Sequence, residues 1–305
     1  MRERGDGRVE QLEHRQIGTR LGEGLRDDGP LLPAAMERTL DAVVTFVTVA
    51  HAHDAALACI ATSAVRRATN AGIFGARVLA VAGVPLVVLS GTAEAAASFR
   101  GATAGAPRDG ARVAVLDIGG GSTECAVGVD GTVFDARSLE LGSVRVAERF
   151  PALLGASPGT AARAAAAEAR GAIRAAVAPL RELTPVTQVR CVAGTPQTLA
   201  AVIAKSHVDA VSGTTLQRAA VDATIERLLD LDVEQRRALP GMLAQRADII
   251  VGGSLVLSEA LRALGADAGL VEANDLLLGF LLEPAGMPQT KCAGPPKAKS
   301  ARAAG

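Results

Sequence analysis

The chain has 305 residues, which is enough for two compact domains, and its 49% hydrophobic and 21% charged residues indicate a globular protein. Lysine plus arginine and aspartate plus glutamate balance at 32 each, and aromatic residues make up 2%, with no Trp and no Tyr. We therefore expect no nucleic-acid-binding function, because the chain has neither a net positive charge nor the aromatic rings on which bases stack.

No apolar run reaches the length of a membrane-spanning helix, and the charged start, residues 1–26, has no signal-peptide core. The four cysteines are far apart and show neither the paired spacing of a zinc site nor the density of a disulfide scaffold. We therefore expect a cytoplasmic protein with reduced cysteines and no membrane contact.

The first predicted elements alternate between helix and strand. Apolar residues recur at helical spacing over residues 33–53, and a strand over 56–62, a helix around 73–78 and a strand over 85–89 follow. Strands separated by helices predict a parallel sheet with crossover connections.

A second unit opens at Ala111 with three strands, which are expected to be antiparallel because Asp130-Gly131 is a hairpin turn. The predicted strands of this unit cover residues 112–117, 124–129, 132–140, 188–193 and 269–272. Its predicted helices cover residues 158–183, a short stretch from 196, and residues 215–231, 246–264 and 274–282. The tail from residue 284 is rich in Pro, Gly, Ala and Lys and is predicted to be disordered.

The sharpest motif is the run Asp117 to Glu124, which leaves a buried strand and turns into the next one. Three successive glycines let main-chain N–H groups approach an anion, and the flanking carboxylates of Asp117 and Glu124 suit a hydrated magnesium ion. An ordinary glycine hairpin with solvated acids is the alternative. The candidate phosphate-binding residues of the loop are Gly119, Gly120, Gly121, Ser122 and Thr123.

Three further segments follow strands and carry polar groups. Arg66 lies in the run after the strand at 56–62, and Glu94 in the run after the strand at 85–89. Either residue taken alone is explained as an ordinary helix start. Gly194 and Thr195 leave another strand into a helix and are candidates for an additional phosphate or nucleotide contact.

These segments, in this order, resemble the exopolyphosphatase and guanosine pentaphosphate phosphatase family, Ppx/GppA. The resemblance covers most of the chain and is carried by residues 20–24, 62–70, 90–95, 117–124, 141–145 and 246–250. It implies an α/β fold of two actin-like (ribonuclease H-like) domains, with mixed sheets flanked by helices and a cleft between them. We expect these domains to span residues 1–108 and 109–283, followed by the tail over 284–305.

The resemblance also implies an enzyme, a magnesium-dependent phosphohydrolase acting on the phosphoanhydride bonds of inorganic polyphosphate or guanosine pentaphosphate. It assigns Glu94 as the catalytic base that activates water, and Arg66 as a guanidinium that holds substrate phosphates. It assigns Asp117 and Glu124 to Mg²⁺, and the loop from Gly119 to Thr123 to phosphate binding. The sequence leaves open whether the protein forms a homodimer.

Two departures from the family pattern affect this interpretation. Thr92 and Ala93 precede Glu94 where the family usually has further acids. The family also opens with a phosphate-binding hairpin, whereas here a strand expected over residues 8–17 has only a few residues ahead of it. The chain is therefore expected to lack this hairpin, through either a misassigned start or a genuinely shortened protein, and to be poorly active.

Two other functions compete with the enzyme. One is a non-catalytic or truncated relative that binds polyphosphate or a guanosine alarmone without turnover. The other is an actin-like ATPase or sugar kinase, which also uses a triple-glycine loop, although the segment over residues 90–95 argues against it.

Overall fold

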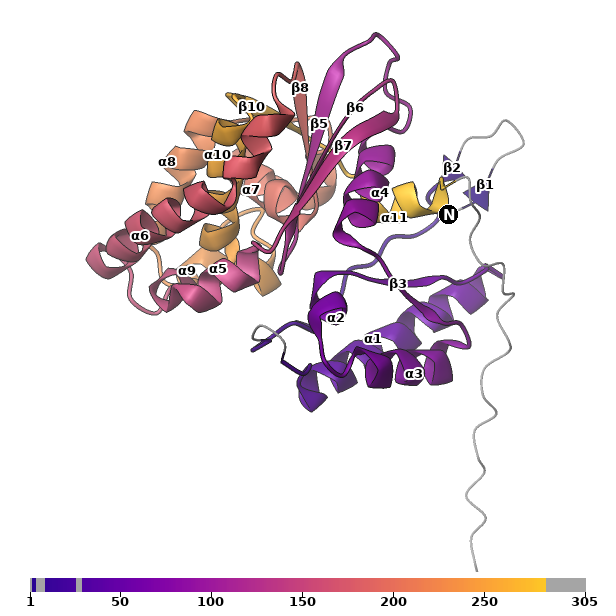
Figure 1. Cartoon of the computed structure of the whole chain (residues 1–305). Coiled ribbons are helices and arrows are strands. Elements are labelled where there is room, and N and C mark those ends of the chain that lie inside the picture. The colour runs from indigo at the N-terminus through magenta and orange to yellow at the C-terminus, as the bar shows by residue number, and fades with distance from the viewer. Residues whose placement is uncertain (1, 4–8, 26–28, 284–305) are drawn as a thin grey trace, which may run out of the picture.

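The computed structural model describes residues 2–3, 9–25 and 29–283. Two units lie beside each other (Figure 1), a larger one built on a six-stranded mixed sheet and a smaller one built on a two-stranded parallel sheet. The predicted α/β class is confirmed. Two further short strands, β1 (Arg2–Glu3) and β2 (Val9–Glu10), pair antiparallel with each other.

The large sheet has the strand order β7-β6-β5-β8-β10-β9. β5 pairs antiparallel with β6 and parallel with β8, β8 pairs parallel with β10, and β9 is antiparallel at the edge. The strands are β5 (Arg112–Ile118), β6 (Thr123–Val129), β7 (Thr132–Leu139), β8 (Gln188–Val192), β9 (Thr215–Gln217) and β10 (Ala268–Val271).

The main hydrophobic core joins this sheet to the helices that cover it. α10 (Ile250–Ala263) is buried at every position except Arg262, so it lies at the centre of the helical layer. The Ala-rich stretch forms α6 (Thr160–Ala176), as its high helix propensity predicts. The other helices of this layer are α5 (Ser143–Arg149), α7 (Gly194–Ala204), α8 (Arg218–Leu229) and α9 (Val233–Arg237).

α4 (Gly91–Thr103) covers another part of the large sheet, where Ala95 and Phe99 form a separate core with Val113, Val115 and other strand residues. α11 (Leu276–Leu281) packs so closely against α4 that their backbones touch. A Cβ added at Gly101 would lie only 1.9 Å from the carbonyl oxygen of Asp275. The last helix therefore lies beside the helix that leads out of the small unit.

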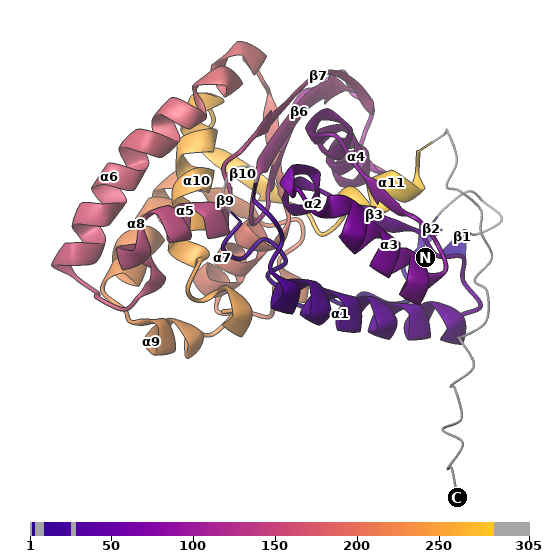
Figure 2. The same cartoon turned by 60° about the horizontal axis from the view of Figure 1, so that its bottom comes forward.

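The small unit contains α1 (Pro33–Ala52), β3 (Cys59–Ala61), α2 (Ser63–Arg67), α3 (Ala71–Ala82) and β4 (Leu86–Val88). β3 and β4 pair parallel, as the alternation of strand and helix predicts. α1 and α3 contact each other along the outer side of this unit (Figure 2). A core around Met36, Leu40, Phe74 and Val78 holds the helices to the strands.

Two element predictions are wrong. Residues 11–20 form no strand, so the strand expected over 8–17 is reduced to β2 within its described part. The helix expected over 215–231 begins only at Arg218, because Thr215–Gln217 pairs with β10. Pairing between segments so distant in the chain overrides the local helical pattern.

In the described part of the chain, no helix is long and apolar enough to cross a membrane. The tail over 284–305, for which disorder is predicted, lies outside the described residues. The domain boundary near residue 108 remains a prediction, since α4 precedes it in the chain yet packs on the large sheet.

Candidate active site

A cavity of about 260 Å³ lies between the two units. The small unit contributes the starts of α2 and α4, which directly follow β3 and β4 and so emerge at the same edge of the parallel pair. The large unit contributes the triple-glycine loop between β5 and β6. The lining includes Thr62, Ser63, Glu94 and the loop residues Gly119, Gly120, Gly121 and Ser122.

The triple-glycine loop is braced by the start of α5. The amide of Ser143 donates to the carbonyl of Gly119 at 3.0 Å, and the amide of Val144 donates to that of Gly120 at 2.9 Å. This contact requires a glycine at 142, because an added Cβ there would lie 2.3 Å from the Gly120 carbonyl oxygen. The hydroxyl of Thr123 donates to the carbonyl of Leu141, so Thr123 stabilises the loop from behind.

Asp117 and Glu124 face each other as a direct pair in the register of β5 and β6. Both are buried, and each carboxylate accepts a hydrogen bond from a serine: Ser98 donates to Asp117 at 2.5 Å and Ser138 to Glu124 at 2.7 Å. Burial, together with the negative charge of Glu94 and other neighbouring carboxylates, raises the pKa of Asp117 to about 7 and that of Glu124 to about 8. The two acids thus form a buried site that favours a positive charge.

These two acids fit a magnesium ion. In the part of the chain that the structure describes, no group of three or more His, Cys, Asp or Glu residues could hold a metal ion. Magnesium needs no such cage, because it is commonly held by one or two carboxylates together with water and substrate phosphates. A divalent cation would also offset the cost of burying two neighbouring carboxylates.

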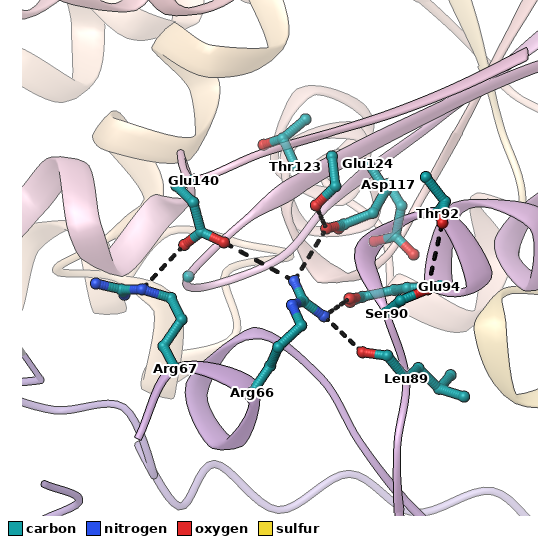
Figure 3. A network of polar contacts seen from close by, with 12 residues as sticks. Arg66, Arg67, Leu89, Ser90, Thr92, Glu94, Asp117, Thr123, Glu124 and Glu140 are labelled. Carbon is teal, nitrogen blue, oxygen red and sulfur yellow. Dashed lines mark hydrogen bonds and ion pairs between the residues drawn. The ribbon is translucent and has the colours of Figure 1, made fainter. Parts of the chain in front are cut away.

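Arg66 of α2 and Glu94 of α4 form an ion pair, as Figure 3 shows. The Arg66 Nη1 group donates to Glu94 Oε2 and to the carbonyl of Leu89, both at 2.9 Å. Glu94 lies in the first turn of α4, where Gly91 allows the helix to approach β7: an added Cβ would lie 2.3 Å from that of Ser138. Two segments that the sequence analysis treats separately therefore form one charged pair.

Glu94 is only 6% exposed. Burial raises its pKa, and the hydrogen bond from Arg66 opposes this rise without cancelling it. A carboxylate whose pKa is shifted toward neutrality is suited to accept a proton from water. Glu94 lines the same cavity as the triple-glycine loop.

Gly194 and Thr195 do not line this cavity. Thr195 is buried against Gly253, and the guanidinium of Arg246 covers Gly194, where an added Cβ would lie 2.0 Å from Nη2. The Nε atom of Arg246 is buried without a hydrogen-bond partner among the described residues, and burial lowers its pKa. Gly194 and Thr195 therefore lie under an arginine at the end of β8, the strand that pairs parallel with β5, and their role as a phosphate or nucleotide contact remains a prediction.

Sequence reasoning missed several polar residues of the cavity. The hydroxyl of Ser63 is buried, has no hydrogen-bond partner in the described part of the chain, and would lie 3.0 Å from a Cβ added at Gly121. Arg67 and Arg145 also line the cavity, and Glu140 bridges them. Ser63, Arg67 and Arg145 lie within segments 62–70 and 141–145, which carry the family resemblance, but no role is predicted for them there.

A glycine-rich turn from a mixed sheet and charged turns from a parallel pair of strands, gathered around one cavity, are typical of a phosphate-handling enzyme of the actin-like class. The model of the Ppx/GppA phosphatase family matches residues 2–278, and the chain therefore belongs to this family. The expected resemblance and the expected phosphohydrolase class are both confirmed.

Relatives support this assignment. Exopolyphosphatase 2 of Mycobacterium tuberculosis is 33% identical over 288 residues, covering 88% of this chain and 87% of the relative. The guanosine-5'-triphosphate,3'-diphosphate pyrophosphatase of Vibrio cholerae is 29% identical over 91% of this chain. The chain spans only 55% of that longer protein.

Solved structures confirm the two-domain actin-like fold. An exopolyphosphatase-like protein matches with a TM-score of 0.80 and 27% identity, covering 90% of this chain and 92% of its own. The Aquifex aeolicus PPX-GPPA enzyme matches with a TM-score of 0.73 and 23% identity over 91% and 92% of the two chains.

Proposed function

We propose that the protein hydrolyses the terminal phosphate of inorganic polyphosphate. One observation carries the proposal: Glu94 and the triple-glycine loop, from opposite units, line the same cavity. The match to a relative named exopolyphosphatase over most of both chains supports this substrate class.

In this proposal the terminal phosphate lies against the triple-glycine loop. Main-chain N–H groups of a glycine-rich turn suit an anion. The hydroxyl of Ser63, which has no hydrogen-bond partner in the described part of the chain, supplies a donor from the small unit. Holding the phosphate from both units fixes the line along which water attacks, which is the main task of a protein in phosphoryl transfer.

Glu94 acts as the general base. Its buried carboxylate accepts a proton from the attacking water, while Arg66, at 2.9 Å from the carboxylate, orients it. Leu89, whose carbonyl also binds Arg66, fixes the guanidinium to the end of β4. No covalent nucleophile is required.

Magnesium would be held by Asp117 and Glu124, and when bound it would neutralise negative charge on the phosphate oxygens. Ser98 and Ser138 orient the two carboxylates by donating one hydrogen bond to each. Both acids flank the triple-glycine loop and are buried, so bulk water has little access to them.

The cavity favours polyphosphate over guanosine pentaphosphate. No aromatic side chain lines it among the described residues, and its charged lining combines three arginines with three glutamates, Arg20, Arg67, Arg145, Glu23, Glu94 and Glu148. A polyphosphate chain needs only positive charge and hydrogen-bond donors, whereas aromatic rings are the usual partners of a nucleobase. Guanosine pentaphosphate remains the second candidate, supported by the relatives that carry its hydrolysis in their name.

The test is phosphate release from polyphosphate and from guanosine pentaphosphate, each with magnesium and with a chelator. We expect magnesium-dependent release that is faster from polyphosphate. Binding without release would instead support a non-catalytic relative. Phosphate transfer from ATP to a sugar, without hydrolysis of either substrate, would support a kinase.

A further inference from the structure

A half-exposed carboxylate lies among three guanidinium groups at the edge of the cavity. Glu140 follows β7, and its Oε2 atom is 2.6 Å from Arg145 Nη2 and 3.2 Å from Arg67 Nε. Its Oε1 atom is 3.9 Å from Arg66 Nη2, and Figure 3 shows Glu140 facing Arg66 and Arg67. Three cations from two units thus share one carboxylate.

This arginine cluster, Arg66, Arg67 and Arg145, adjoins the triple-glycine loop. Arg145 Nε donates to the carbonyl of Gly121 at 3.1 Å, and Arg67 and Arg145 both line the cavity. The Nη2 group of Arg66 is buried and has no hydrogen-bond partner within the described ranges. The carboxylate oxygens that face this group, Oε1 of Glu140 and Oε1 of Glu124, each lie 3.9 Å away. The cluster therefore offers a donor that neither carboxylate satisfies with a hydrogen bond.

We propose that the arginine cluster is a second phosphate subsite, which takes the phosphate next to the terminal one, and that Glu140 occupies it until substrate enters. The proposal rests on the proposed function. A linked phosphate presents more acceptor oxygens to planar guanidinium groups than one carboxylate does. Glu140 is 46% exposed along its side chain, so it has an open route into solvent.

A carboxylate of the protein that occupies the subsite competes with substrate. The apparent affinity for substrate is then the intrinsic affinity multiplied by the fraction of molecules whose subsite is open. Removing the charge of Glu140 should therefore tighten substrate binding. Exposed ion pairs are individually weak, so the expected gain from freeing the cluster is modest, about three- to tenfold in Kd. A single inorganic phosphate, which does not reach the subsite from the glycine loop, should show little of this gain.

The test compares binding of tripolyphosphate and of inorganic phosphate to the wild-type protein and to Glu140→Gln by titration calorimetry. Glu23→Gln is the matched control, because Glu23 lines the same cavity but pairs with Arg38 outside the cluster. We expect tripolyphosphate to bind about three- to tenfold more tightly to Glu140→Gln, with a smaller change for Glu23→Gln. Unchanged or weaker binding to Glu140→Gln, or an equal gain in both variants, would overturn the proposal.

A purely structural role of Glu140 predicts a different outcome, because the cluster also joins α2 to the connection between β7 and α5. In that case Glu140→Gln would lower the melting temperature without any gain in affinity, which also refutes the subsite. If Glu140→Gln does not fold, Glu140→Ala repeats the measurement. If the wild-type protein releases no phosphate, the proposed function fails, but the binding titration still decides the subsite.

Discussion

The two walls of the cavity are held in different ways. The loop wall, residues 119–122, is fixed by main-chain hydrogen bonds to the start of α5 and by the ladder between β5 and β6. The helix wall, which carries Glu94, is fixed from behind by the side chain of Arg66, which binds both Glu94 and the carbonyl of Leu89. The loop wall thus depends on backbone geometry and the helix wall on charge.

This difference separates two kinds of damage. A change of charge in the helix wall should remove chemistry while leaving the phosphate loop in place. A change of backbone volume beside the loop wall should disturb binding and folding together.

Glu94→Gln is expected to have the largest effect on turnover. The amide keeps the shape of the side chain but cannot accept a proton, so phosphate release should fall by about a hundredfold or more. Steady-state kinetics with polyphosphate measures the loss, and calorimetry should show that tripolyphosphate binding is largely retained.

Glu37→Gln is the control for this variant, because Glu37 pairs with Arg77 on the outer side of the small unit. Full turnover in Glu94→Gln would mean that Glu94 is not the general base and serves only as an acidic residue at the start of α4.

Gly142→Ala should have the next largest effect, because its Cβ would meet a backbone carbonyl at 2.3 Å and the loop must shift to make room. We expect destabilisation of about 1–3 kcal/mol, measured by denaturant unfolding, together with weaker phosphate binding. Gly171→Ala is the control, because nothing lies within 4 Å of a Cβ added within α6. Equal stability of the two variants would mean that α5 does not brace the loop.

Asp117→Asn should change the pH dependence of stability. The pKa of Asp117 is about 7 in the folded protein against a usual value of 3.8, so the unfolded chain loses its proton first as pH rises. Without metal, this group's contribution to the free energy of unfolding is therefore present at about pH 4 and is lost as pH approaches about 7.

Melting temperatures in a chelator at pH 5 and pH 8 measure this effect. The wild-type protein should melt lower at pH 8. Asp117→Asn should show a smaller difference, because it lacks one buried acid with a pKa in this range and lacks the negative charge that helps to raise the pKa of Glu124. If the melting temperature changed equally with pH in both proteins, burial would not raise the pKa of Asp117 as stated.

The two walls also differ in how far the sequence predicts them. The loop wall is contiguous, and a buried strand, an acid and three glycines specify both its position and the pairing of Asp117 with Glu124. The contact between Arg66 and Glu94 is not predicted, because side-chain contacts between separate segments leave no local pattern; only their separate roles follow from the family resemblance.

Residues whose roles depend only on tertiary contacts escaped prediction. Glu140 and Arg145 stand in a connection and a short helix that look solvent-exposed in sequence, and only the approach of α2 brings Arg67 to them. The predicted start of α8 is too early for a similar reason. The spacing of apolar residues does not show that Thr215 pairs with β10.

The central claim is that both walls hold one phosphate, and a crystal structure of Glu94→Gln with tripolyphosphate and magnesium tests it most directly. We predict the terminal phosphate between the triple-glycine loop and residue 94, with the metal at Asp117 and Glu124 and the next phosphate at the arginine cluster. A chain bound elsewhere, or a terminal phosphate that contacts only one wall, would contradict the account.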